Sequence, residues 1–572
     1  MSKENSSINQ LFDSALKLHQ SGNLKEAENL LKKNLESFPR HLPSIFLLGT
    51  LSAQIKKYQT AKKLLQQAIE LKPDFTEGHN NLGNVFQELG EYQEAISCYQ
   101  RAIKLDPNNA EFYFHLAWIK KDLGEYYSAI NHYKKAISIS KNYVLAKYNL
   151  ARLNLATENF SEGWRDFEMR QDSEIVPQRI KNILNLKQWN GKPFDGTLFV
   201  HGEQGVGDLI VHSSIIADLH KIQPDICLTV DKRFVNLFKR SFKNIDIRNY
   251  DSKLDYTDND RHITLASLGF FLRQSIHDFP KQPEAYIVPD PDKVNHFKSI
   301  LPQNKKLKVG LSWSTSGIRS ATRNISLNQM AKFLTLQDVE YVNLQYGDTL
   351  EERRSFKKEF HKEIICFDQF DLTNNFENLS ALIQCCDLVI TISNITAHIS
   401  GAVGKKTWVV VPVSTQWHWF HKRNNSLWYP NVKLFRQQQY GKWEDVIDTI
   451  YNQILNINKL NSLKEAEFKV FSQWGDDGII QYLINKIPIT NQTFVEFGVE
   501  DYTESNTRFL LMNNNWSGLV IDGSYSNICN IKSSYYYWMY DLKAVHSFID
   551  VDNINDTLLD NGFKGDIGIL SI

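Results

Sequence analysis

The chain of 572 residues has no long hydrophobic run. Its strongly apolar stretches, such as residues 408–413, fall far short of the roughly 20 residues that cross a bilayer. The first ten residues, MSKENSSINQ, have no apolar core of the kind that a secretory signal requires. We therefore expect a cytoplasmic protein without a membrane span.

Cysteine is scarce and net charge is absent. The six cysteines form no C-x-x-C pair, and no histidine cluster stands beside them at zinc spacing. In a chain this long, such usage indicates reduced thiols rather than a disulfide framework. The 65 basic and 65 acidic side chains cancel, which argues against a strongly basic nucleic-acid binder. We expect no metal site, no cofactor and no nucleic-acid partner.

The composition of the chain is that of an ordinary globular protein. Hydrophobic residues make up 42% and charged residues 23%, so wholesale disorder is excluded. At about 150 residues per domain, the length predicts three to four domains.

The N-terminal third repeats itself every 34 residues, five times in register. The clearest unit covers residues 76–109. Small residues recur where two helices of a hairpin would cross closely. Glycine and proline mark the ends of the helices, because glycine allows a tight turn and proline stops a helix. The glycines at the expected turns are Gly22, Gly90 and Gly124, and the prolines after the second helices are Pro39, Pro73 and Pro107.

This pattern over residues 8–170 resembles the tetratricopeptide repeat family. The resemblance implies an all-α solenoid whose degenerate fifth unit joins the next domain, and a concave groove that binds a protein partner. The residues expected to face the groove are Phe12, Phe46, Asn80, Phe114 and Tyr148. The alternative for the aromatic ones is packing between repeats.

The middle third changes period: short apolar runs alternate with helical stretches. Buried parallel strands are predicted at residues 197–201, 226–230, 263–265, 308–312, 341–345, 388–392 and 407–411. Runs of this kind, with helices between them, are typical of α/β folds with parallel sheets. A polar stretch at residues 281–306 is expected to divide the region into two halves, whose ligands would bind at the carboxyl ends of the strands.

The first chemical constellation is Glu-Gln-Gly-Val-Gly-Asp at residues 203–208, between a predicted strand and a predicted helix at 209–219. Gly205 and Gly207 allow a tight turn, and Asp208 stands at the start of the helix. A carboxylate there is either a helix N-cap or a general base, and spacing alone favours the cap.

The second constellation follows the strand at 308–312. Ser314, with Arg319 and Arg323 nearby, predicts a diphosphate cradle, although arginines on a solvated loop are an equal alternative. The third is Gln345 at the end of the next strand, a buried amide that could read a base or ribose.

The fourth constellation follows the strand at 388–392. Ser393 or Asn394 is expected to cap a short helix whose free N–H groups could hold phosphate. His398 lies one turn into this helix and faces either the ligand or the sheet. Aromatic and histidine residues follow at 417–419 and 428–430, where they pack a surface or floor a sugar pocket. The one D-x-D sequence, Asp258 to Asp260, lies in a polar loop and is interpreted as solvated.

As an ordered set, these elements resemble glycosyltransferase family 9, similar to heptosyltransferases, as fused to such repeats in bacterial proteins. The resemblance covers residues 160–457 and implies a GT-B fold of two Rossmann-like halves, 176–295 and 306–457. It implies inverting, metal-independent transfer of a sugar from a nucleotide-sugar donor, with Asp208 as the base. The donor-binding candidates are Gly205, Gly207, Ser314, Arg323, Gln345, Ser393, Asn394, Thr396, His398 and Gly401.

The C-terminal hundred residues form another unit. Strands are predicted at 493–497 and 518–521, with a helix at 505–513 between them, and Asp522 closes the second strand. This resembles the FkbM-type, methyltransferase-like domains, without their usual glycine repeat. The chain ends within an expected strand, so we expect residues 465–572 to be an incomplete α/β Rossmann-like region that does not bind S-adenosylmethionine.

Two function classes follow. The first is a glycosyltransferase acting on a glycan or protein acceptor, with the repeats recruiting a partner or the acceptor. The second is a non-catalytic repeat scaffold with a degenerate GT-B domain that mediates protein–protein interaction. Ser393 favours the second, because the family usually has an aspartate there.

Overall fold

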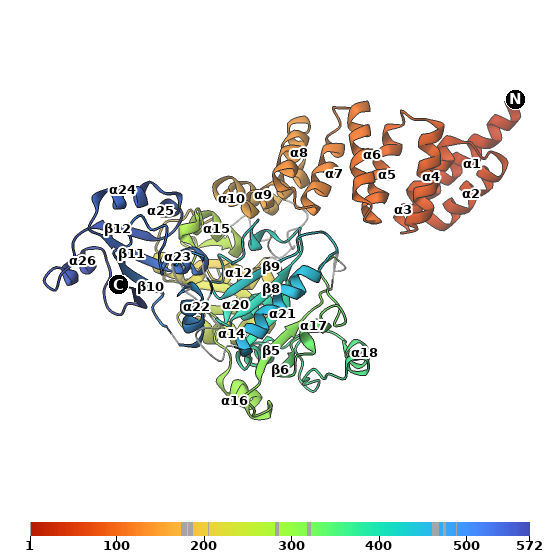
Figure 1. The fold of residues 1–572 in the computed structure, drawn as a ribbon. Helices are drawn as coiled ribbons and strands as arrows, with labels where there is room; N and C mark the ends of the chain where they lie inside the picture. Colours follow the sequence, from red (N-terminus) through yellow and green to blue (C-terminus); the bar gives the residue numbers. More distant parts are fainter. Residues whose placement is uncertain are drawn as a thin grey trace.

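The protein has three parts: a helical arm, a central unit with two sheets and a C-terminal unit with a third (Figure 1). The computed structural model describes residues 2–172, 180, 187–203, 205–280, 285–316, 322–459, 468, 470–472, 476–487 and 489–571. The arm extends from the central unit, and its N-terminus lies at the far end (Figure 1).

Five consecutive helix pairs build the arm. They are α1 (Ser2–Gln20) with α2 (Leu24–Ser37), α3 (Leu42–Gln54) with α4 (Tyr58–Leu71), α5 (Thr76–Glu88) with α6 (Tyr92–Leu105), α7 (Ala110–Asp122) with α8 (Tyr126–Ile139), and α9 (Val144–Ala156) with α10 (Phe160–Phe167). The short 3-10 helix η1 (Glu168–Asp172) follows them.

The 34-residue period is visible in the backbone itself. Left-handed residues occur in the turn of each pair: Gly22, Lys56, Gly90, Gly124 and Glu158, with φ of +80°, +61°, +77°, +79° and +66°. Glycine adopts this conformation without the penalty that a side chain imposes. The predicted glycine turns are thus confirmed, and the same turn forms in the two pairs that have lysine or glutamate there.

The groove prediction holds less well. Asn80 and Phe114 are buried at 6% and 4% exposure. The Phe114 ring stacks on Tyr143 at 5.0 Å, and Phe46 packs on Phe75 at 4.7 Å. For these aromatic residues the alternative of packing between repeats is the correct one, because adjacent helix pairs cover their rings.

The central unit contains two parallel sheets. The first has the order β3-β2-β1-β4, and the second has the order β6-β5-β7-β8-β9. The strands are β1 (Leu198–His201), β2 (Ile226–Val230), β3 (Asp246–Asn249), β4 (Arg261–Thr264), β5 (Leu307–Ser312), β6 (Val339–Asn343), β7 (Leu388–Ile392), β8 (Thr407–Val411) and β9 (Val432–Arg436). Every predicted strand of this region is present, and the parallel α/β class is confirmed.

Two strands escaped prediction, and both lie at a sheet edge. β3 reads Asp-Ile-Arg-Asn and β9 reads Val-Lys-Leu-Phe-Arg. Only part of each is buried, so neither forms the continuous apolar run that marks a central parallel strand.

The helix predicted at 209–219 is in fact two helices, α12 (Val206–Ser213) and α13 (Ile216–Ile222). Between them Ser213 and Ser214 donate side-chain hydrogen bonds back to the carbonyls of Leu209 and Val211, at 2.6 and 2.7 Å. Serine hydroxyls that bond to the preceding turn compete with the helix and bend it.

The polar stretch at 281–306 is more than a divider, although residues 281–284 lie outside the described part. It contains α16 (Pro291–Ile300), which Asp290 caps by accepting hydrogen bonds from the backbone N–H groups of Asp292 and Lys293. α16 packs against α19 (Phe376–Gln384) of the second half.

The remaining helices of the central unit are η2 (Lys232–Phe234), α14 (Val235–Ser241), η3 (Leu265–Ser267), α15 (Leu268–Leu272), η4 (Ile276–Asp278), α17 (Ala331–Leu334), α18 (Leu350–Phe360), α20 (Ile395–Ala402), η6 (Trp417–Trp419) and α21 (Glu444–Lys459).

The C-terminal unit is a third parallel sheet with the order β12-β11-β10-β13. Its strands are β10 (Thr493–Phe497), β11 (Ser517–Asp522), β12 (Leu542–His546) and β13 (Ile569–Ser571), and its helices are α22 (Asp476–Lys486), α23 (Arg508–Asn514), α24 (Tyr525–Ser533), α25 (Tyr535–Met539) and α26 (Ile554–Asp560). The strands predicted at 493–497 and 518–521 are present. The helix predicted at 505–513 begins later, at Arg508, because Glu496 binds the hydroxyls of Ser505 and Thr507 in the preceding loop.

The arm and the central unit share one hydrophobic core. A single buried cluster runs from Phe114 on α7 to Leu434 on β9 and includes Trp164 of α10. The C-terminal unit has separate clusters. Among the residues that the structure describes, no helix combines the length and apolar character needed to cross a membrane.

Candidate functional site

The two sheets of the central unit meet through the helices that follow β1 and β7. α12 begins after the turn that leaves β1, and α20 begins after the turn that leaves β7. At Gly207 a Cβ atom would lie 3.1 Å from Cδ2 of His398. Only glycine gives the backbone of α12 this close approach without a shift of the ring. The structure therefore brings Gly207 and His398, from two different constellations, into contact.

Asp208 is the third residue of α12, and Gly205 is its N-cap. The Asp208 carboxylate accepts a hydrogen bond from the Gly205 backbone N–H, as the third residue of a capping box does. The N-cap alternative for Asp208 is thus wrong in its position, since the carboxylate stabilises the helix start from inside the first turn.

The Asp208 carboxyl group titrates unusually high. Burial raises its pKa from 3.8 to about 6, while the positive charge of Arg152 lowers the pKa and the negative charge of Glu203 raises it. The side chain still keeps some solvent exposure. A carboxylate with a pKa near 6 is ionised at pH 7 yet accepts a proton readily, which is the property of a general base.

Three buried histidines lie in this region: His398 of the contact itself, His418, whose ring lies 4.8 Å from that of His398, and His212 on α12. Burial lowers the pKa of His212 and of His398 to about 3, and that of His418 well below its ordinary value. All three are neutral at pH 7. A neutral imidazole cannot offset phosphate charge, so electrostatic stabilisation of a diphosphate would have to come from other groups.

His398 is held by aromatic neighbours. Its Nδ1 lies 3.1 Å from the Tyr429 hydroxyl, and its ring stacks on Trp419 at 5.1 Å. Gly401, one turn further along α20, packs under the Tyr429 ring, where a Cβ atom would come within 2.5 Å. His398 therefore faces α12 from a packed aromatic wall, and Gly401 serves the packing of that wall.

The turn after β7 is braced by its own side chains. Asn394 is the N-cap of α20, and its Oδ1 accepts from the Thr396 backbone N–H at 3.0 Å. Its Nδ2 donates to Ser312 Oγ at 2.8 Å and to the Ser314 carbonyl at 3.2 Å. Ser393 accepts from Trp419 Nε1 at 2.7 Å. Of the two residues predicted to cap this helix, the structure selects Asn394.

Ser393 also donates to Gln416 Oε1 at 2.9 Å, which completes its hydrogen bonds. The hydroxyl of Thr396, by contrast, is fully buried without a hydrogen-bond partner among the described residues. It is an unsatisfied polar atom enclosed within the first turn of α20.

Gln345 connects the ends of β5 and β6. Its Oε1 accepts from the backbone N–H groups of Trp313 and Ser314, both at 2.8 Å, and its Nε2 donates to the Tyr346 carbonyl at 2.8 Å. The amide thus braces the turn that contains Ser314 and has its hydrogen bonds within the chain.

Arg323 is partly buried beside the same turn. Burial lowers its pKa, and Tyr346 raises it. The Tyr346 hydroxyl donates to Thr315 Oγ1 at 2.8 Å, which places these groups at the carboxyl end of the second sheet. Arg319 lies outside the described residues.

Sequence reasoning missed the contribution of the arm to this region. Arg170 of η1 is 2% exposed, and its Nη2 lies 2.7 Å from Glu203 Oε1. Burial opposes the charge of Arg170, but Glu203 and Glu168 together raise its pKa. The positive charge of Arg152 on α9 lowers the pKa of Asp208, as described above. No local motif marks either arginine, since both act on residues far away in the sequence.

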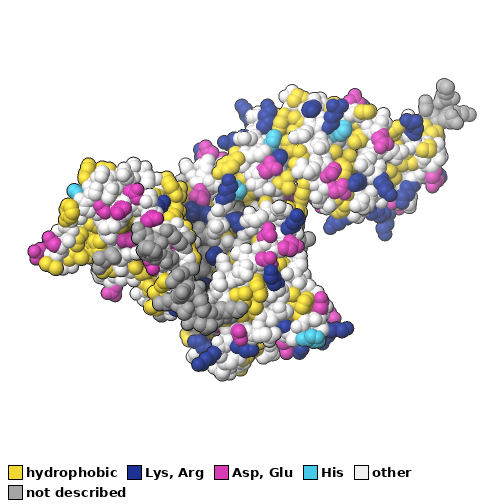
Figure 2. All heavy atoms as spheres, in the orientation of Figure 1, with side chains coloured by type: hydrophobic (Ala, Val, Ile, Leu, Met, Phe, Trp, Pro, Cys, Tyr) yellow, Lys and Arg dark blue, Asp and Glu magenta, His cyan; other side chains and the backbone are white. Residues whose placement is uncertain are grey.

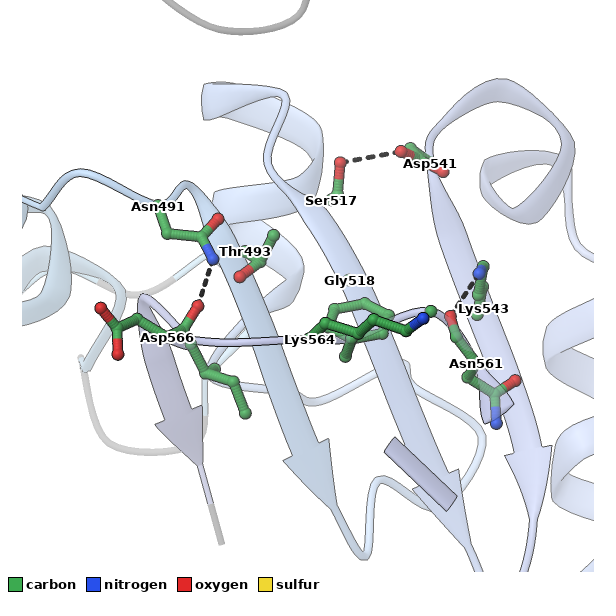
Figure 3. A pocket seen from close by; sticks show the side chains of 12 residues that line it. Asn491, Thr493, Ser517, Gly518, Asp541, Lys543, Asn561, Lys564 and Asp566 are labelled. Atoms are coloured by element: carbon green, nitrogen blue, oxygen red, sulfur yellow. Dashed lines mark hydrogen bonds between the residues drawn. The ribbon is translucent and has the colours of Figure 1, made fainter. Parts of the chain in front are cut away.

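Two cavities lie away from the α12–α20 contact. One of about 420 Å³ lies between η1 and β4. The other, of about 350 Å³, lies in the C-terminal unit at the amino ends of β10, β11 and β12, lined by Thr493, Ser517 and Lys543 among others (Figure 3). Ligands of parallel α/β sheets bind at the carboxyl ends, so the position of this second cavity does not match a cofactor site of that kind.

At the carboxyl edge of that sheet, Asp522 is occupied by its own chain. Its carboxylate accepts from the backbone N–H groups of Glu500 and Ser524, at 2.9 and 2.7 Å. These bonds hold the turn after β10 against the end of β11.

Within the described part of the chain, no group of three or more His, Cys, Asp or Glu residues is placed to hold a metal ion. In the D-x-D loop, Asp260 accepts hydrogen bonds from the backbone N–H groups of Thr197 and Thr257, at 2.9 and 2.7 Å. This carboxylate fastens the loop to the start of β1.

Family models for the tetratricopeptide repeat match residues 76–109 and 98–131, and a TPR repeat model matches residues 52–90. The N-terminal repeats are therefore tetratricopeptide repeats, as the sequence predicts. Such repeats support interaction with a protein partner.

The chain is 29% identical over 331 residues to Protein FlbA of Caulobacter vibrioides, covering 54% of this chain. It spans about half the length (55%) of that relative. Similar solved structures include MamA, at 25% identity, TM-score 0.26 and coverage of 28% of this chain and 92% of that one. A tetratricopeptide repeat protein from Parabacteroides merdae matches at 22% identity, TM-score 0.27 and coverage of 29% and 67%.

Proposed function

We propose that the central unit is a glycosyltransferase that moves a sugar from a nucleotide-sugar donor to a glycan or protein acceptor. The ordered motifs resemble glycosyltransferase family 9, and the observation that carries the proposal is the contact between Gly207 and His398. It joins the helices at the carboxyl ends of β1 and β7, the edges at which parallel α/β sheets bind ligands. A GT-B arrangement of two Rossmann-like halves would place donor and acceptor on opposite sides of this contact.

Asp208 would act as the base of an inverting reaction. It would take the proton of an acceptor hydroxyl while that oxygen forms a bond to the anomeric carbon of the donor sugar. The bond from that carbon to the phosphate oxygen would break, and the nucleoside diphosphate would leave with the electron pair. Arg323 and the N-terminus of α20 would offset the developing negative charge, so that no metal ion is required.

The test is Asp208→Asn, assayed by release of nucleoside diphosphate from a panel of nucleotide sugars. Asparagine keeps an oxygen that can accept the Gly205 N–H but cannot take a proton. We expect a folded protein with near-normal donor binding and transfer at least ~10²-fold slower, within the range for general-base loss. The matched control is Asp195→Asn, an exposed aspartate before β1. Transfer by Asp208→Asn at the parent rate would refute the assignment.

A second candidate is a non-catalytic scaffold. The observation in its favour is that the polar side-chain groups of Ser393, Asn394 and Gln345 are already hydrogen-bonded to other groups of the chain, as described above. Thermal unfolding with UDP, GDP, ADP and CDP separates the two candidates. A nucleotide at 100 times its dissociation constant adds ~2.7 kcal/mol to the free energy of unfolding. Stabilisation by one of them favours the enzyme, and no change with any of them favours the scaffold.

A further inference from the structure

The cavity of about 420 Å³ between η1 and β4 lies at the carboxyl edge of the first sheet. Thr264 is the last residue of β4 and pairs in register with His201, the last residue of β1. Thr264 and Ser267 of the following helix η3 both line the cavity. Parallel α/β sheets bind their ligands at this edge, and small-molecule sites have volumes of this order. The position and the size of the cavity therefore both suit a bound ligand.

One part of the lining is aromatic. The rings of Phe270 and Phe271 meet edge to face with centroids 5.1 Å apart, and the Trp189 ring lies 5.1 Å from that of Phe271. The Trp189 indole is held in place because its Nε1 donates to the Lys192 carbonyl at 2.8 Å. Both phenylalanines are only half-buried. These rings thus form an ordered apolar wall that a ligand can still reach.

A second part of the lining is polar and comes from η1. Gln171 Nε2 donates to Glu168 Oε2 at 2.9 Å and to Ser267 Oγ at 2.8 Å, which fixes the orientation of the amide. Its Oε1 accepts no hydrogen bond from any residue that the structure describes. The Glu168 side chain is 34% exposed, and its carboxylate accepts from Arg170, Gln171 and Ser267, three bonds where about four are available. Both side chains can therefore accept a further hydrogen bond from a ligand.

The charges of this lining are already compensated. Glu168 pairs with Arg170 Nη1 at 2.7 Å, and Arg165 at the same cavity pairs with Asp166 at 3.0 Å. A phosphate or an ammonium group would find no unpaired countercharge on these residues, and an uncompensated charge is costly to enclose. A neutral sugar ring fits better, because it has C–H groups that pack on aromatic faces and hydroxyl groups that donate to carboxylate and amide oxygens.

We propose that this cavity is a subsite for one neutral sugar residue of a glycan, which packs on Phe270 and Phe271 and donates hydroxyl hydrogen bonds to Gln171 and Glu168. The role of that glycan as the acceptor rests on the proposed function, whereas its binding does not. Since η1 follows directly on the last helix pair of the arm, the end of the arm forms part of the subsite. The inference narrows the acceptor from a glycan or a protein to a glycan.

The first test is saturation-transfer NMR of the full chain with the methyl glycosides of glucose, galactose, mannose and N-acetylglucosamine. We expect at least one of them to bind. Gln188 is an exposed residue that lines the cavity, so Gln188→Trp should fill the space and abolish the signal without disturbing a buried group. The matched control is Lys187→Trp, at an exposed neighbour outside the lining, which should bind like the parent. Binding of none of the four, or equal binding by Gln188→Trp, would overturn the proposal.

The second test addresses the chemistry of the lining. Phe270→Leu keeps the apolar volume but removes the ring, so it should weaken binding of the best glycoside by about 3–10-fold, while Phe270→Tyr should stay within about twofold of the parent. The methyl glycosides of glucuronate and glucosamine carry a negative and a positive charge, and each should bind at least ~5-fold more weakly than the best neutral one. An unchanged affinity in Phe270→Leu, or tighter binding of either charged glycoside, would contradict the assignment.

Transfer kinetics separate this inference from the proposed function. With oligosaccharides of the bound sugar as acceptors and the most active nucleotide sugar as donor, Gln188→Trp should raise the acceptor KM at least ~10-fold and leave kcat unchanged, as loss of a binding contact does. Glycoside binding without transfer by the parent would support the subsite and count against the proposed function. Transfer with an unaltered acceptor KM in Gln188→Trp would overturn the inference and leave the proposed function standing.

Discussion

The two junctions of the central unit are built differently. Towards the arm, Trp164 is fully buried and its Nε1 donates to the Arg273 carbonyl at 2.8 Å, while Glu158 pairs with Arg423 at 2.6 Å. Towards the C-terminal unit, an exposed hydrogen bond of 3.2 Å joins Lys406 to Asn485. The first junction is a continuous core, and the second joins units that have separate cores.

This difference teaches where the repeat array ends as a structural unit. Its fourth and fifth helix pairs belong to the core of the central unit, whereas the first three pairs form two separate clusters, one of which also includes Leu116 and Ile119 of α7. A repeat boundary in the sequence is therefore not a boundary of cooperative unfolding.

The C-terminal unit also presents many hydrophobic side chains at its surface (Figure 2), with Trp538, Phe548 and Val551 exposed at 75%, 79% and 88%.

The largest expected effect follows from breaking the shared core. Trp164→Ala should lower the free energy of unfolding of the transition that contains α9, α10 and the central sheets by about 3–5 kcal/mol. Calorimetry would resolve it from the transition of the C-terminal unit, which should not move. The matched control is Leu511→Ala in the buried cluster of the C-terminal unit, which should lower only that unit's transition. If each substitution shifted both transitions equally, the comparison would fail.

The buried ion pair at the arm junction should come next. Glu203→Ala leaves the Arg170 charge buried with Glu168 as its remaining partner, at a cost of about 3 kcal/mol. Glu351→Ala, which breaks the exposed pair with Arg354, is the control and should change the free energy of unfolding by less than about 0.5 kcal/mol. Chemical denaturation measures both, and equal effects would contradict a structural role for the buried pair.

Asp208 adds a pH dependence to the same transition. The pKa of Asp208 is raised from 3.8 to about 6 in the folded protein, so protonation of this carboxyl group favours folding. Its contribution to the free energy of unfolding is fully present below pH 3.8 and is lost as the pH rises through 6. Asp208→Asn should therefore be more stable than the parent at pH 8, by ~1–3 kcal/mol after allowance for partial solvent exposure, and similar to it near pH 4. Unfolding midpoints from pH 4 to 8 test this. A parent that gains stability relative to the variant as the pH rises would show the opposite shift.

The smallest effects compare the polar contacts of the two junctions. Glu158→Gln should cost ~1 kcal/mol, because its partly buried pair with Arg423 crosses to the shared core. Lys406→Ala should cost less than about 0.5 kcal/mol, because its hydrogen bond to Asn485 is exposed. Urea midpoints would rank the two, and the reverse order would mean that the C-terminal junction is the tighter one.

Much of the fold follows from local sequence. The glycine turns and the buried strands of both central sheets carry patterns that depend on a few neighbouring residues, so they were predictable. The edge strands β3 and β9 were not, because half-exposed strands mix charged and apolar residues. The break after Ser213 also escaped prediction, since it depends on hydroxyls that bond back to the preceding turn.

The candidate site was predictable only in part. Its glycines, Asp208 and His398 stand in motifs, and the structure brings Gly207 and His398 together. Gln345 and Ser393 brace turns only because partners such as Trp313 and Trp419 lie next to them in the fold. The effect of Arg152 on the pKa of Asp208 likewise depends on how the arm packs. Such long-range pairings leave no periodic signal in one sequence.

The shared core also has a consequence for whatever the first three helix pairs capture. A flexible tether would let a captured partner explore many positions and would give it a modest effective concentration at every one of them. An arm fixed through α9 and α10 presents its cargo over a narrow range of positions. Its effective concentration at Asp208 is then either very high or nearly zero, depending on the length of the cargo. Selection of a target would in that case be a matter of reach as well as of affinity.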